Sequence, residues 1–118
     1  MQITPNLVSW QWRTYPDAHH DRTNLAVHAL LVPLFVAGLS AAVVAPLFGH
    51  PWVALAGLAA ASVSLGIQGT THKRETQAPA PFLSPLDFAV RIVVEQFLTF
   101  PGWVLSGGFA RAWKGAAR

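Results

Sequence analysis

The histidines are the residues of this chain whose type and spacing best suit chemistry. His20, Asn24 and His28 recur at intervals of four, which is the spacing of one face of a helix. His19 adjoins this set, and His72 follows a long apolar stretch. Neutral imidazole nitrogens bind iron, zinc or copper. Because the chain contains no cysteine, histidines and carboxylates must supply any transition-metal site.

The elements that position these histidines follow from an uneven charge distribution. Charged residues make up 11% of the chain, against roughly 25% in an ordinary soluble domain, and hydrophobic residues make up 53%. Residues 25–71 contain no Asp, Glu, Lys or Arg. A soluble domain needs a largely polar surface, so this pattern argues against a soluble enzyme and against a disordered chain.

The net charge of +3 does not indicate a nucleic-acid-binding protein. The eight basic residues form no patch and are not interleaved with stacking aromatic residues. We therefore expect a lipid bilayer, and no nucleic acid, among the partners of this chain.

The uncharged stretch is long enough for two membrane crossings. A helix rises about 1.5 Å per residue, and the hydrocarbon core is about 30 Å thick. Gly49 and Pro51 mark a turn in the middle of the stretch. We expect one membrane helix at residues 24–48 and a second at residues 51–69. The second is rich in Gly, Ala and Ser, which allow helix backbones to approach closely in lipid.

A short interfacial helix is expected before this hairpin, at residues 4–14, where tryptophans are frequent. Tryptophan favours the interface between membrane and water. The same preference predicts that Trp52, Trp103 and Trp113 are interface anchors.

The C-terminal part is expected to enter the membrane again. The Ser84-Pro85 pair is typical of an N-cap and a first helical position, and it predicts a helix over residues 85–99. The Pro101-Gly102 pair is expected to break the chain before a second apolar piece, at residues 102–113. The two pieces form either one bent crossing or two half-inserted helices.

These elements predict one all-α, membrane-embedded domain over residues 1–118. The expected fold is an integral membrane helical bundle with a transmembrane hairpin, one or two further membrane helices and a short N-terminal interfacial helix. Basic residues flank the hairpin only at its open end, so the positive-inside rule predicts that the N-terminus and the His72 loop are cytoplasmic. In a bacterium the protein would lie in the inner (plasma) membrane. The hairpin gathers four histidines at one membrane face and leaves His50 at the opposite turn.

Polar residues beside the histidines suit a supporting role. Asn24 and Gln68 are placed to orient histidine ligands by hydrogen bonding, and so is Glu75. These three residues lie at the ends of the expected helices that the hairpin brings together.

One polar stripe runs along the expected helix at residues 85–99. Asp87, Arg91 and Glu95 are spaced by four and share one face. Their charges favour an internal ion pair against the hairpin. Glu95 is in addition a candidate catalytic residue, because a carboxylate at membrane depth is a functional candidate by default.

Three sequence blocks carry a resemblance to a known family. They are Tyr15-x3-His19-His20-x3-Asn24-x3-His28, then Gln68-x3-His72-x2-Glu75-x3-Pro79-Ala80, and a third block from Pro81-Phe82 through Pro85-Leu86-Asp87-Phe88 and Glu95-Gln96 to Ser106-Gly107-Gly108. In order and spacing the blocks resemble those of a small membrane-protein family. The characterised member of that family is the fungal 2-hydroxy fatty acid dioxygenase of fatty acid α-oxidation.

The resemblance implies an Fe(II)-dependent dioxygenase that uses O2 to shorten a 2-hydroxy fatty acid by one carbon, or that acts on a related lipid. It implies four iron ligands, His19, His20, His28 and His72. Beside these ligands, we expect Tyr15, Asn24 and Gln68 to be supporting residues, and Glu75 and Glu95 to be candidate catalytic carboxylates. The substrate carboxylate is expected to bind the nearby basic residues Arg22, Lys73 or Arg74.

Two other functions stay open from the residues. A non-catalytic membrane scaffold or lipid-binding protein would use the histidines only as interfacial hydrogen-bonding groups. A zinc-dependent membrane hydrolase would use Glu75 or Glu95 as a general base. The small size of the chain and its small-residue helix also allow a homodimer.

Overall fold

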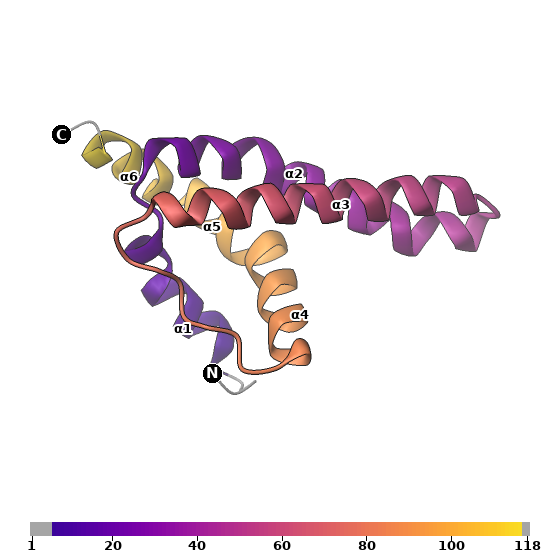
Figure 1. Cartoon of the computed structure of the whole chain (residues 1–118), viewed down its shortest axis with the longest axis horizontal. Coiled ribbons are helices and arrows are strands. Elements are labelled where there is room, and N and C mark those ends of the chain that lie inside the picture. The colour runs from indigo at the N-terminus through magenta and orange to yellow at the C-terminus, as the bar shows by residue number, and fades with distance from the viewer. Residues whose placement is uncertain (1–5, 117–118) are drawn as a thin grey trace.

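The computed structural model describes residues 6–116, and this part of the chain is all-α (Figure 1). Its helices are α1 (Leu7–Thr14), α2 (Arg22–Val44), α3 (Pro51–Thr71), α4 (Pro85–Val94), α5 (Phe100–Leu105) and α6 (Gly108–Ala116). Helices α2 and α3 lie side by side as a long hairpin. At its open end α2 contacts α6 and the Glu95–Thr99 turn, whereas α1 and α4 extend away from the hairpin (Figure 1).

Three segments are long and apolar enough to cross a membrane, namely Arg22–Phe48, Pro51–Arg74 and Pro85–Leu105. The first two are the arms of the hairpin, and the third runs obliquely to them (Figure 1). The predicted fold class, a membrane hairpin with a further membrane helix, is therefore confirmed.

The two arms of the hairpin approach closely through small residues. The buried face of α3 consists of Gly57, Ala61, Ser64 and Gln68. Where the arms cross, a Cβ atom added to Gly38 would lie 2.5 Å from the carbonyl oxygen of Gly57. The Ser64 hydroxyl donates a 2.5 Å hydrogen bond to the carbonyl of Leu31 in α2. Small residues therefore set the distance between the arms, as expected for helices packed in lipid.

The tip of the hairpin is formed where the sequence predicts it. Gly49 has a φ of 77°, a left-handed conformation that favours glycine, and Pro51 begins α3. His50 and Trp52 are both exposed at this tip. His50 thus lies far along the hairpin from the other histidines.

The expected break at Pro101-Gly102 is wrong. Residues 85–105 form one continuous helix, and the break comes at Gly107, which has a φ of 87°. A π-helical turn, Glu95–Thr99, directly precedes the proline, and the Phe100 N–H donates to the Glu95 carbonyl five residues back. Proline lacks an N–H and clashes with a regular helical turn. The π turn shifts the hydrogen-bond register just before Pro101, so the helix continues past it.

The hydrophobic core lies at the open end of the hairpin. It contains Tyr15, Leu25, Val32, Phe100 and Trp103. Trp103 is 3% exposed and packs edge-on against Tyr15, with ring centroids 5.1 Å apart. The prediction that Trp103 is an interface anchor is therefore wrong, because its ring fills the space between the hairpin and the N-terminal segment.

Helix α1 is joined to the third long helix by a buried amide. The Gln11 side chain donates to the Arg91 carbonyl at 2.9 Å and accepts from the Thr99 hydroxyl at 2.6 Å. The expected helix at residues 4–14 is observed from Leu7, and residues 1–5 lie outside the described part of the chain.

The linker before α4 is extended, as its prolines predict, and it is held by Arg91. The guanidinium donates to the carbonyls of Ala80 and Pro81 at 2.8 and 2.9 Å, and it lies 3.3 Å from the Asp87 carboxylate. Ser84 caps α4 by accepting the Asp87 N–H at 3.0 Å. The Asp87–Arg91 ion pair is confirmed, but Arg91 contacts the linker and α1 and not the hairpin, and Glu95 lies outside the pair.

The close approach of the arms predicts that Gly38→Ala destabilises the protein. The added methyl meets the backbone of α3, which cannot move without separating the helices, so we expect a loss of about 1–3 kcal/mol in the free energy of unfolding. The matched control is Gly66→Ala, because a Cβ there has no neighbour within 4 Å. Unfolding of both variants in detergent would test this, and a Gly38→Ala variant as stable as the Gly66→Ala control would contradict it.

Candidate metal centre

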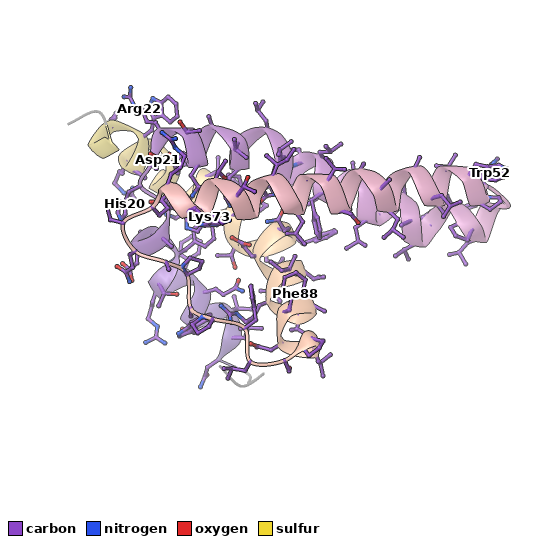
Figure 2. The ribbon with its side chains drawn as sticks, viewed as in Figure 1. His20, Asp21, Arg22, Trp52, Lys73 and Phe88 are labelled. Carbon is purple, nitrogen blue, oxygen red and sulfur yellow. The ribbon has the colours of Figure 1, made fainter. Side chains whose placement is uncertain are left out.

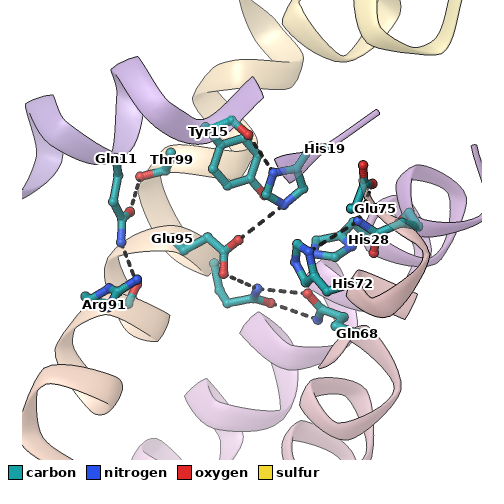
Figure 3. A network of polar contacts seen from close by, with 12 residues as sticks. Gln11, Tyr15, His19, His28, Gln68, His72, Glu75, Arg91, Glu95 and Thr99 are labelled. Atoms are coloured by element: carbon teal, nitrogen blue, oxygen red, sulfur yellow. Dashed lines mark hydrogen bonds and ion pairs between the residues drawn. The ribbon is translucent and has the colours of Figure 1, made fainter. Parts of the chain in front are cut away.

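Four side chains from distant parts of the sequence meet at the open end of the hairpin. His19 follows a short 3₁₀ turn, His28 lies on α2, His72 directly follows α3, and Glu95 directly follows α4. One nitrogen of each imidazole and one oxygen of the carboxylate all lie within 4.8 Å of one another. Figure 3 shows them facing a common space. This three-histidine, one-glutamate group, called the His3Glu cluster below, is a donor set that could hold a metal ion.

Backbone carbonyls fix two of the histidine rings. The Nδ1 atom of His19 lies 2.6 Å from the Tyr15 carbonyl, and that of His28 lies 2.9 Å from the Asn24 carbonyl. A carbonyl only accepts hydrogen bonds, so each Nδ1 carries the hydrogen and each Nε2 has a free lone pair. Both Nε2 atoms are buried without a hydrogen-bond partner in the described part of the chain. Buried lone pairs oriented in this way fit metal ligands.

The three imidazole rings are nearly perpendicular to one another. The interplanar angles are 88° for His19 and His28, 83° for His19 and His72, and 84° for His28 and His72, with centroids 4.7 to 5.0 Å apart. Tyr15 stacks on His19 at 3.8 Å and limits the movement of its ring. The rings thus pack edge to face around one point and do not stack upon each other.

The electrostatics of the cluster favour neutral imidazole. Burial lowers the pKa of His19 well below its ordinary value, and the neighbouring rings of His28 and His72 lower it further. His19 is therefore neutral near pH 7, which is the form that binds metal. The Nε2 of His19 and a Glu95 oxygen are 3.7 Å apart, beyond hydrogen-bonding distance.

Tyr15 contributes a buried phenol to the same space. Its hydroxyl is buried near the Glu95 carboxylate and makes no hydrogen bond of good geometry among the described residues. Burial raises the pKa of Tyr15 well above its ordinary value, and the negative charge of Glu95 raises it further. The phenol therefore stays protonated and is available as a hydrogen-bond donor.

Asn24 ties the two arms of the hairpin together beneath His72. Its amide nitrogen donates to Glu75 at 2.8 Å and lies 3.5 Å from the Nδ1 of His72. Its amide oxygen accepts from the Thr71 hydroxyl at 2.7 Å. Asn24 is fully buried, so it supports the position of His72 from inside the fold.

Gln68 lies beside the cluster in a pair with Gln96, a residue of the third motif block to which the sequence analysis gave no role. Their side-chain amides exchange two hydrogen bonds of 3.0 and 2.9 Å, and the Gln96 amide lies 3.3 Å from a Glu95 oxygen. Both glutamines are buried. The signal in the sequence was a polar amide next to Glu95, outside the stripe of Asp87, Arg91 and Glu95.

The structure places His20 outside the His3Glu cluster. The shared helix face does not extend to His20, because α2 begins only at Arg22. His20 is exposed, and its backbone N–H donates to Glu75 at 2.8 Å. Glu75 also accepts the Asp21 N–H at 2.9 Å. Glu75 therefore holds the chain at the start of α2 and is not part of the cluster.

The three basic residues expected to bind a substrate carboxylate lie at the same end of the hairpin. Figure 2 shows Arg22 and Lys73 there, opposite the tip at Trp52. The Arg22 guanidinium donates to the Trp113 carbonyl, and its carbon lies 4.7 Å from the centre of the Trp113 ring. Arg74 pairs with Asp21 at 3.0 Å, and Lys73 is exposed. None of the three is within the cluster.

No protein-family model, curated protein or solved structure matches this chain. The resemblance to the 2-hydroxy fatty acid dioxygenase family therefore stays a prediction from sequence motifs.

The cluster predicts that His28→Ala abolishes stoichiometric binding of a transition metal. The change removes a buried donor whose lone pair has no other partner, so protein purified without chelator should lose its metal. His50→Ala is the matched control, since His50 is exposed at the far tip of the hairpin. Elemental analysis measures both, and equal metal contents in the two variants would contradict the cluster as the binding site.

The Gln68–Gln96 pair predicts that Gln96→Leu weakens metal binding without abolishing it. Gln96→Leu removes the amide beside Glu95 and leaves Gln68 without its partner, so metal affinity should fall by about 10–100-fold. Competition with a chelator of known affinity measures this. Unchanged affinity in a folded Gln96→Leu variant would show that the pair has no influence on the cluster.

Proposed function

We propose that this protein is a membrane-embedded Fe(II)-dependent dioxygenase that acts on 2-hydroxy fatty acids or a related lipid. The observation that carries the proposal is the convergence of His19, His28, His72 and Glu95. These residues belong to the motifs that resemble the family, and three of them are its expected iron ligands.

The donor set supports iron. Imidazoles with one carboxylate, and room for further ligands, are typical of non-haem Fe(II) oxygenases. When bound, ferrous iron would supply the redox chemistry that activates O2. The chain's own residues would hold the ion through three imidazoles and the Glu95 carboxylate. Tyr15 and Trp103 would keep bulk water from one side of the site, since both are buried beside it.

The reaction balances with O2 as the only oxidant. In a 2-hydroxy acid the bond between C1 and C2 breaks, C1 leaves as CO2, and C2 becomes the carboxyl carbon of the shortened acid. The substrate loses four electrons, which reduce one O2 and yield water. No further reductant is needed.

Reconstitution with iron tests the proposed activity. We expect protein loaded anaerobically with Fe(II) to consume O2 when given 2-hydroxypalmitate and to release pentadecanoate and CO2. Palmitate, which lacks the 2-hydroxyl, is the control substrate, and His28→Ala is the control protein. Protein that binds no Fe(II), or that holds zinc and hydrolyses lipids without consuming O2, would contradict the proposal.

A further inference from the structure

A cavity of about 570 Å³ adjoins the His3Glu cluster. Its volume lies within the range of roughly 300–1,000 Å³ that is typical of small-molecule sites. The cluster forms one end of it. Most of the remaining wall is apolar and includes Trp10, Leu65, Ala78, Phe82, Phe88 and Ile92. The cavity is therefore suited to a ligand with a polar head and an apolar tail.

Packed aromatic side chains form the apolar end of the cavity. Phe82 comes from the extended linker and Phe88 from α4, and their rings pack edge to face at 4.8 Å. Arg91 holds the linker in place, and its guanidinium carbon lies 5.0 Å from the centre of the Trp10 ring and 4.3 Å from the centre of the Phe82 ring. The neighbouring Leu83 and Leu86 are exposed apolar residues, so an apolar chain can reach this end from lipid.

The lining of the cavity offers no free side-chain cation among the described residues. Arg91 is the only lysine or arginine in it, and its guanidinium is already bound to Asp87 and to two linker carbonyls. The lining also includes two carboxyl groups, those of Asp17 and of Glu95 in the cluster. An acid head group in this cavity would thus lie beside carboxylates unless a metal ion supplied positive charge.

We propose that this cavity binds the single alkyl chain of a lipid acid, with its tail along the wall that includes Trp10, Phe82 and Phe88 and its head at the His3Glu cluster. The positive charge that holds the head is that of the metal ion and not that of Arg22, Lys73 or Arg74. The proposal rests on the proposed function for the metal ion, and it deepens that function by assigning the substrate site.

The shape of the cavity leads to a test by photo-crosslinking. The probe is 2-hydroxypalmitate with a diazirine near its methyl end, irradiated without O2 with the Fe(II)-loaded protein in detergent. We expect adducts on the tail end of the cavity, at Trp10, Phe82 or Phe88. A second apolar groove is lined by residues of α2, α5 and α6, among them Val36, Val104 and Phe109. Adducts in that groove, or adducts scattered over the hairpin, would overturn the proposal.

Two glycines of α3 provide a matched pair of variants. A Cβ at Gly69 or at Gly66 meets no atom within 4 Å, but only Gly69 lines the cavity. Gly69→Phe should fill the space and lose the cavity adducts, whereas Gly66→Phe should keep them. Metal content checks that both variants are folded. Equal labelling of the two variants would overturn the proposal.

Alanine variants of the three basic residues test whether the metal ion supplies the positive charge that holds the head group. Arg22→Ala, Lys73→Ala and Arg74→Ala, made singly, should each retain labelling by the acid, whereas the metal-free protein should lose it. The methyl ester of the probe has no charge and should label the cavity with or without metal. Loss of labelling in any of the three alanine variants that still binds metal would overturn the role given to the metal ion.

These outcomes separate the inference from the proposed function. Crosslinking needs no turnover, so cavity adducts without O2 consumption would contradict the dioxygenase activity and leave the binding site standing. Turnover of 2-hydroxypalmitate with adducts elsewhere would overturn the binding site alone.

Discussion

The burial of imidazole nitrogens without hydrogen-bond partners is the constraint on which the rest of this structure depends. The Nε2 atoms of His19 and His28 are enclosed next to the carboxylate of Glu95. Burying polar groups without partners is unfavourable, and more so in an apolar protein. A shared metal ion would remove this cost for both nitrogens at once. The surrounding network keeps the donors of the cluster facing one point.

The hairpin supplies the geometry for that network. Close contact at Gly38 and Gly57 fixes how α2 and α3 cross. Asn24 then joins their open ends, where it lies between Glu75 and Thr71. The third long helix adds Glu95 from its π turn, and such turns are frequent at functional sites. The same turn lets the helix pass Pro101, so one local distortion serves both the fold and the site.

The sequence was sufficient for the parts of the fold that are local or that follow from charge. The uncharged stretch and Gly49 define the hairpin, and a hairpin necessarily brings His28 and His72 to one end. Other features depend on tertiary packing. The burial of Trp103 and the partner of Gln68 could not be read from residue type, and the helix begins at Arg22, too late to include His20. Glu95 was a candidate by its depth, but its place among the histidines follows from the oblique course of α4.

X-ray absorption of the iron-loaded protein tests the central claim most directly, because it reports the ligands of the metal itself. The His3Glu cluster predicts several imidazole nitrogens and a carboxylate oxygen at roughly 2 Å, with the multiple scattering that imidazole rings produce. A metal surrounded only by oxygen ligands, or a spectrum with no imidazole scattering, would contradict the account.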